Sequence, residues 1–225
     1  MRKDPLVNGQ YYHVISRSIA KYTIFNSPED YGRFMEITDL YRFSDFIYRY
    51  SNFLALTQEF QESIIENIRE ESSLIVEIVA YCIMPTHIHF ILKQKVNGGI
   101  SKYMARILNS YTRYFNTKLK RKGPLYDGKF TSILIKNDEH LLHLTRYIHL
   151  NSVSAGLVRI PENWQYSSYK EYIESDVDEL KNNLCNYGEI IDLKTEEYKN
   201  FVNNRIAYQI ELSLIKYLII NDYDG

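Results

Sequence analysis

The chain of 225 residues carries 27 Lys and Arg against 28 Asp and Glu, a formal net charge of −1, in the composition of a soluble globular protein. The N-terminus has no signal-peptide pattern, and no apolar run approaches the roughly 20 residues of a membrane span. We therefore expect a cytoplasmic protein without membrane contact. Cys82 and Cys185 are far apart and match no metal or redox spacing, which predicts free thiols.

Charge is distributed unevenly along the chain. Residues 93–136 contain eleven Lys or Arg and one acid, Asp127, whereas residues 160–225 contain six basic and thirteen acidic residues. A basic segment of this kind is typical of proteins that bind a phosphate backbone. The near-zero net charge therefore does not exclude a polyanionic partner.

The N-terminal third predicts a strand, a helix and a connecting segment. Residues 10–16 are rich in aromatic and β-branched side chains, which favours a strand. Ser27 and Pro28 then supply an N-cap and a proline at the first helical position. The apolar residues that follow recur at helical spacing: Tyr31, Phe34, Met35, Ile37 and Leu40. Residues 42–72 indicate only helical or irregular connecting structure.

The middle of the chain predicts a hairpin, a helix and a further strand. Residues 74–83 and 87–94 read as strands whose connection is too short for anything but a hairpin. Residues 100–120 form an amphipathic, basic helix, and residues 129–136 a strand. Strand, helix, strand, strand, helix, strand is the ferredoxin-like order, so we expect an α+β fold with an antiparallel sheet and both helices on one face.

One more helix and a C-terminal extension complete the prediction. A helix capped at Asn137 runs to about Asn151, with an apolar stripe of Leu141, Leu144 and Ile148. A polar stripe lies beside it, formed by His140, His143, Tyr147 and Asn151. Tyr147 is either an amphipathic packing residue or a nucleophile. Residues 163–169 read as a capping or docking segment, and residues 173–225 as an acidic, mainly helical extension.

Two histidines on the strand from residue 87 suggest chemistry. In an extended chain His87 and His89 project to one side, while Ile88 and Phe90 flank the opposite side. Paired imidazoles are a common first step in holding a divalent metal. The alternative is a half-exposed strand with histidines on its wet face, and the short spacing alone does not decide between the two.

Several motifs occurring in order resemble the IS200-like single-tyrosine transposases, and among them the REP-associated tyrosine transposases. The motifs are YHVISR at 12–17, MPTHIHF at 84–90, YTRYFN at 111–116, GKF at 128–130, RYIHLNSVSAGLV at 146–158 and WQYSSY at 164–169. The resemblance covers roughly residues 10–172, and we assign residues 1–172 as a catalytic domain with an insertion at about 42–72. The family's usual Asn-Pro-Val is here Asn-Ser-Val at Asn151, which removes no functional group.

The resemblance implies a metal-dependent single-stranded DNA endonuclease and strand transferase. Carried onto this chain, His87 and His89 match the metal-binding pair, Tyr147 the nucleophile that forms a 5′-phosphotyrosine, and Asn151 the third metal ligand. The implied ion is Mg²⁺ or Mn²⁺, and the implied partner is single-stranded or hairpin DNA, bound by a monomer or a homodimer. The protein would then be nucleoid-associated when bound to DNA.

The basic segment supplies candidate phosphate contacts. They are Arg106, Arg113, Lys118, Lys120, Arg121, Lys122 and Lys129. Tyr111, Tyr114 and Tyr126 are candidates for base stacking, with core packing as the alternative. Two other functions compete with transposition: a domesticated DNA-binding protein of the same fold, and a metal-dependent hydrolase without a covalent step.

Overall fold

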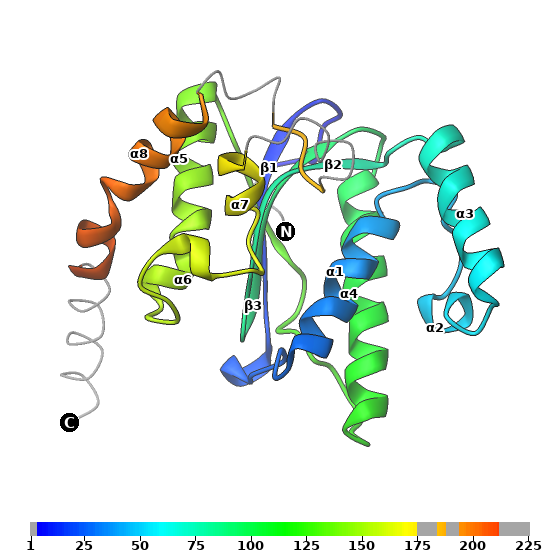
Figure 1. Ribbon diagram of the computed structural model, residues 1–225. Helices are drawn as coiled ribbons and strands as arrows, with labels where there is room; N and C mark the ends of the chain where they lie inside the picture. The colour runs from blue at the N-terminus through cyan, green and yellow to red at the C-terminus, as the bar shows by residue number, and fades with distance from the viewer. Residues whose placement is uncertain (1–3, 175–183, 188–193, 212–225) are drawn as a thin grey trace. The chain divides into compact units, whose positions relative to one another are not determined.

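The computed structural model describes residues 4–174, 184–187 and 194–211 (Figure 1). The four strands are β1 (Tyr11–Arg17), β2 (Val76–Met84), β3 (His87–Gln94) and β4 (Thr131–Leu134). The helices before β4 are η1 (Ile19–Lys21), α1 (Pro28–Leu40), α2 (Tyr50–Phe53), α3 (Gln58–Glu71) and α4 (Gly99–Lys118). Those after it are α5 (Asp138–His149), α6 (Asn151–Ser154), η2 (Pro161–Asn163), α7 (Tyr169–Ile173) and α8 (Thr195–Asn203).

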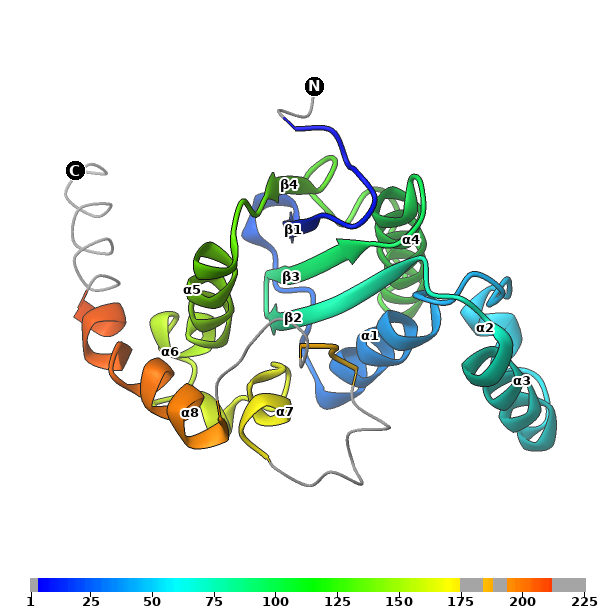
Figure 2. The same ribbon diagram turned by 90° about the horizontal axis from the view of Figure 1, so that it is seen from above.

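The strands form one antiparallel sheet in the order β2-β3-β1-β4, seen from above in Figure 2. This order, with α1 after β1 and α4 after β3, is the predicted ferredoxin-like arrangement, so the fold class is confirmed. β4 is shorter than predicted, because only Thr131 to Leu134 pair with β1, in the register Tyr12 to Leu134. β2 is buried at nearly every position, as its continuous apolar sequence requires.

The chain divides into two compact units. The first comprises Met1–Glu77, Pro85–His87 and Leu92–Leu134, and the second Ile78–Met84, Ile88–Ile91 and Ile135–Gly225. In the first unit α1 and α4 lie side by side (Figure 1), joined where the Tyr103 hydroxyl donates to the Thr38 carbonyl at 3.0 Å. The Phe34 and Tyr111 rings meet edge to face, with centroids 5.3 Å apart. Aromatic packing therefore forms much of this core.

One side-chain cap and a pair of glycines explain where α1 and α4 begin. The Ser27 hydroxyl accepts a hydrogen bond from the Asp30 amide at 3.4 Å, which starts α1 where predicted. Gly98 has φ +71° before α4. Gly99 lies so close to the Ile75 carbonyl oxygen that an added Cβ would stand 2.2 Å from it. The glycine pair is thus required for both conformation and space.

The second unit joins the middle of β2 and β3 to α5, α6, α7 and α8. Residues 163–169 dock on β2, as predicted: the Trp164 indole donates to the Ile83 carbonyl at 3.1 Å, and the Tyr81 amide donates to Ser168 Oγ at 2.9 Å. The Tyr172 hydroxyl, on α7, donates to the Val79 carbonyl. Within the described part of the chain, no helix has the length and apolarity to cross a membrane.

Both cysteines are buried free thiols, as predicted. Burial raises the pKa of Cys82 to about 12, so its thiol stays protonated. Of the predicted helical extension over residues 173–225, residues 175–183, 188–193 and 212–225 lie outside the described residues, and α8 lies within the described part.

Candidate active site

The two histidines of the candidate site open strand β3. His87 is half-buried and His89 only 2% exposed, while Ile88 and Phe90 between and beyond them are fully buried. Both sides of the strand are therefore covered at this point. The alternative of a histidine on a wet strand face does not describe His89.

The His87 imidazole is held in its neutral form. Its Nδ1 lies 2.9 Å from the Thr86 hydroxyl. Burial, and secondarily the Arg17 charge, lower the pKa of His87 to about 4. A neutral imidazole is the form that binds a metal.

Helix α5 carries the candidate nucleophile. The Asn137 side chain accepts a hydrogen bond from the His140 amide at 2.8 Å and so starts the helix. Leu141 and Ile148 are buried, as the apolar stripe predicts, whereas Leu144 is half-buried. Tyr147 lies beside that stripe with 43% of its surface exposed. A buried stripe thus fixes the helix while the phenol stays accessible to a substrate.

The Tyr147 ring stands next to His89. Their ring centroids are 6.0 Å apart with an interplanar angle of 83°, an edge-to-face contact between α5 and β3 within the second unit. The two residues are 58 positions apart in the sequence. The fold therefore brings the candidate nucleophile into contact with one of the three candidate metal ligands.

Asn151 is the first residue of α6, just after the break at Leu150. The predicted single helix is in fact two: α5 ends at His149, and the amide of Leu150 bonds back to both Arg146 and Ile148. Asn151 is 9% exposed, and its buried Nδ2 has no hydrogen-bond partner among the described residues. A half-turn of the amide exchanges Nδ2 for Oδ1, the atom that would bind a cation. An unsatisfied buried amide fits a ligand role.

The donor set around this position is short of carboxylates. Across residues 4–174, 184–187 and 194–211, no three His, Cys, Asp or Glu side chains gather in one cluster. Asn151 stays the candidate third ligand. Its amide oxygen is a donor of the kind that Mg²⁺ and Mn²⁺ accept, whereas the imidazoles suit Mn²⁺ better than Mg²⁺.

A buried hydrogen-bond chain supports α5 from behind. Tyr198 on α8 donates to Thr145 Oγ1 at 2.9 Å, because Thr145 itself donates to the Leu142 carbonyl. The Tyr198 hydroxyl also lies 2.7 Å from His149 Nδ1, and His149 Nε2 lies 2.8 Å from Ser168 Oγ. Burial lowers the pKa of His149 to about 3, so this ring is neutral. No sequence pattern indicates this role, since Tyr198 is one of 21 tyrosines.

The seven candidate phosphate contacts differ in their surroundings. Lys118 pairs with Asp30 at 2.7 Å, and Arg121 donates to the Asn116 side chain and the Pro124 carbonyl. Lys120, Lys122 and Lys129 are exposed. The remaining two, Arg106 and Arg113, line a surface pocket on α4.

The candidate stacking tyrosines are largely packing residues. Tyr111 is fully buried and its hydroxyl donates to the Ile24 carbonyl at 2.6 Å, while Tyr126 is 7% exposed. Tyr114 is half-buried and donates to Asp30 at 2.9 Å. Core packing therefore accounts for Tyr111 and Tyr126.

The chain is similar to known proteins both in sequence and in fold. Residues 46–151 match the family described as IS200-like transposases. A Haemophilus influenzae protein described as a REP-associated tyrosine transposase is 28% identical over 111 residues, which are 45% of this chain and 63% of the relative. A solved structure of a REP-associated tyrosine transposase bound to a REP hairpin matches 87% of this chain and 95% of its own, with a TM-score of 0.50 and 15% identity.

These matches confirm the resemblance drawn from the motifs. The match to the IS200-like transposase family spans just under half of the chain, and both His87 and Tyr147 fall inside the matched segment. The two individual proteins that the chain resembles are both described as REP-associated tyrosine transposases. The Haemophilus protein is similar in sequence, and the solved structure is similar in fold. The alignment with the Haemophilus protein spans less than two thirds of that protein.

Proposed function

We propose that this chain is a metal-dependent single-stranded DNA endonuclease and strand transferase with Tyr147 as its nucleophile. The observation that supports it most is the edge-to-face contact of Tyr147 with His89, at a centroid distance of 6.0 Å. His87, His89 and Asn151 would hold the metal. The resemblance to REP-associated tyrosine transposases supports the same assignment.

The chemistry follows from a tyrosine nucleophile on a phosphodiester. The Tyr147 phenolate oxygen attacks phosphorus, the bond to the 3′ oxygen breaks, and the products are a 5′-phosphotyrosine and a free 3′-hydroxyl. A bound divalent ion would polarise the phosphate and offset negative charge in the transition state. The hydroxyl of another strand then attacks phosphorus and releases Tyr147. Because the covalent link preserves the phosphodiester energy, rejoining needs no ATP.

The proposed substrate is single-stranded DNA that forms a hairpin. The basic segment of residues 93–136 and the REP hairpin bound by the structural relative support this choice. The chain would act as a monomer or a homodimer at the nucleoid. The division into a catalytic domain to residue 172 and an extension beyond it stays a prediction.

The test is capture of the covalent intermediate. The full chain would be incubated with Mn²⁺ and a pool of labelled single-stranded hairpins with randomised flanks, and adducts would be resolved on a denaturing gel. We expect a labelled protein band in the wild type that Tyr147→Phe lacks and that EDTA prevents. Tyr22→Phe is the matched control, because Tyr22 is similarly exposed, at 51%.

The alternatives correspond to different outcomes. Binding of hairpins without cleavage or adduct would indicate a DNA-binding protein of this fold. Cleavage that survives Tyr147→Phe would contradict the nucleophile assignment and favour a hydrolase without a covalent step.

A further inference from the structure

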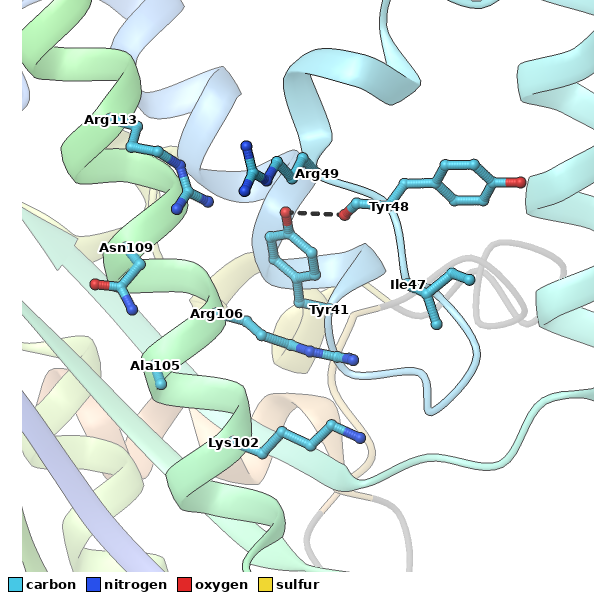
Figure 3. A pocket seen from close by; sticks show the side chains of 9 residues that line it. All are labelled: Tyr41, Ile47, Tyr48, Arg49, Lys102, Ala105, Arg106, Asn109 and Arg113. Atoms are coloured by element: carbon cyan, nitrogen blue, oxygen red, sulfur yellow. Dashed lines mark hydrogen bonds between the residues drawn. The ribbon is translucent and has the colours of Figure 1, made fainter.

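A pocket of about 330 Å³ lies on the first unit, between α4 and the segment that precedes α2 (Figure 3). It is lined by Tyr41, Ile47, Tyr48, Arg49, Lys102, Ala105, Arg106, Asn109 and Arg113. We call these residues the α4 pocket. Four of the nine are cations and none is an acid, and none belongs to the candidate active site.

The spacing of three cations along α4 places them on the face of the helix that lines the pocket. Lys102 and Arg106 are four residues apart and Arg113 follows seven later, so they lie along one face of α4. Tyr103 and Ile107 belong to the buried core face of the same helix. The pocket face is thus distinct from the face that packs in the core.

The fourth cation is positioned by a short hydrogen-bonded segment. The Tyr41 hydroxyl donates to the Tyr48 carbonyl at 3.3 Å and accepts from the Tyr50 amide at 3.1 Å. These two bonds fix the backbone on both sides of Arg49, which is the N-cap residue of α2. In Figure 3 the Arg49 and Arg113 side chains are turned toward one another. The sequence could not show this pairing, which joins segments 64 residues apart.

The charges of the α4 pocket are not neutralised within the part of the chain that the structure describes. Among the described residues, none of its four cations forms an ion pair with a carboxylate. Elsewhere in the same unit cations are paired, as Lys95 is with Glu77 at 2.5 Å and Arg69 with Asp39 at 2.8 Å.

Gathering like charges without a counter-charge is unfavourable. Arg106 is half-buried and donates to the Phe43 carbonyl at 3.4 Å, a neutral acceptor that does not offset its charge. Burial lowers the pKa of Arg106, which shows that its charge is partly desolvated. A bound anion would relieve both costs.

We propose that the α4 pocket is a second DNA contact, which takes a backbone phosphate of the substrate strand outside the catalytic centre. Guanidinium groups from two elements offer the forked donors that phosphate oxygens accept. The pocket is at the small end of ligand sites, which suits one nucleotide unit of a strand. Ile47, 78% exposed, and Tyr48, 38% exposed, supply apolar surface at the same place. This inference rests on the proposed function and adds Arg49 and Lys102 to the phosphate contacts.

The test measures strand binding without cleavage. Fluorescence anisotropy of a labelled single-stranded oligonucleotide would be followed in EDTA over a series of potassium chloride concentrations, with the full chain. We compare the wild type with Arg49→Gln/Arg113→Gln, two exposed positions. The double variant should raise Kd about tenfold and reduce the salt slope by about 0.7, the value for the one phosphate that the variant no longer neutralises.

The matched control is Lys95→Gln/Lys170→Gln, which removes the same charge at two exposed positions outside the pocket. A Kd and salt slope equal for the two double variants would overturn the proposal, as would a wild type that binds no strand. Calorimetry with inorganic phosphate tests whether the pocket instead binds a free phosphoryl ligand. In that case the double variant would lose phosphate binding but would still bind the strand as the wild type does. This result would also overturn the proposal. The binding measurement needs no cleavage, so its result does not depend on whether the covalent adduct at Tyr147 forms.

Discussion

The edge of one aromatic ring meets the face of another where Tyr147 on α5 contacts His89 on β3, with centroids 6.0 Å apart. His89 is 2% exposed and Tyr147 43% exposed, so the imidazole is fixed in the protein while the phenol reaches solvent. A fixed candidate metal ligand beside an accessible candidate nucleophile is the arrangement that the proposed attack on a phosphodiester would require. The proposed mechanism depends on this pair more than on any other contact.

Metal binding should depend on the histidine pair. His87→Ala and His89→Ala each remove a proposed metal ligand, and each should raise the Kd for Mn²⁺. Mutating a residue that only hydrogen-bonds to a metal ligand typically costs roughly 10–100-fold in metal affinity, so removing the ligand itself should cost at least as much. Isothermal titration with Mn²⁺ measures this in the absence of DNA. His143→Ala is the control, because His143 is exposed on α5 and bonded to Arg146 at 2.8 Å. Unchanged Mn²⁺ affinity in both variants would contradict the proposed metal site.

The hydrogen bonds of Tyr198 should stabilise the second unit. Tyr198→Phe leaves the buried Nδ1 of His149 without a partner, which should cost about 1–3 kcal/mol of unfolding free energy. Urea denaturation of the full chain measures the difference. Tyr208→Phe, at a tyrosine 49% exposed, should change the stability little. Equal stabilities of the two variants would show that the chain through His149 contributes nothing.

Gly99 should tolerate no side chain. Gly99→Ala places a Cβ 2.2 Å from the Ile75 carbonyl oxygen, so the backbone must shift, at a cost of about 1–3 kcal/mol. Gly32→Ala, within α1 and with open space around it, should instead stabilise by about 0.5–1 kcal/mol through helix propensity. Thermal unfolding compares both with the wild type. A Gly99→Ala protein as stable as the wild type would contradict the close approach.

Acid should weaken the first unit through Asp30. Burial alone raises the pKa of Asp30, but hydrogen bonds from Lys118, the Asn26 amide and Tyr114 outweigh it, and the net pKa is lowered. The stability that Asp30 contributes is therefore present above its unfolded pKa, near 4, and is lost as pH falls through the folded value.

Asp30→Asn tests this pH dependence. The variant should lose about 2 kcal/mol at pH 7 and should lose less further stability than the wild type between pH 5 and 2. Urea unfolding at several pH values provides the comparison, with the exposed Asp127→Asn as control. Parallel stability curves for the wild type and Asp30→Asn would exclude this role.

Local sequence patterns predicted most of the fold because each element has a strong local signal. The Ser27 cap, the hairpin before His87 and the amphipathic pattern of α4 all correspond to observed elements. The break between α5 and α6 was missed, since the end of a helix at His149 depends on a single residue, Leu150, and not on periodicity. Likewise β4 is shorter because pairing with β1, rather than propensity, sets its length.

The candidate site was less accessible to local reasoning. Spacing placed His87 and His89 on one side of a strand, but the contact of His89 with Tyr147 joins residues 58 positions apart and was anticipated only through the family resemblance. The α4 pocket shows the same limit: Arg49 lies in a segment whose pattern predicted only a connection. Long-range packing determines such pairs, and no period in the sequence encodes it.

The most direct test is to map the covalent bond itself. After reaction of the full chain with Mn²⁺ and hairpin DNA, nuclease and protease digestion followed by tandem mass spectrometry locates the nucleotide on the protein. We predict a 5′-linked nucleotide on Tyr147 and on no other tyrosine. An adduct on a different residue, or cleaved DNA with no adduct at Tyr147, would contradict the proposed mechanism.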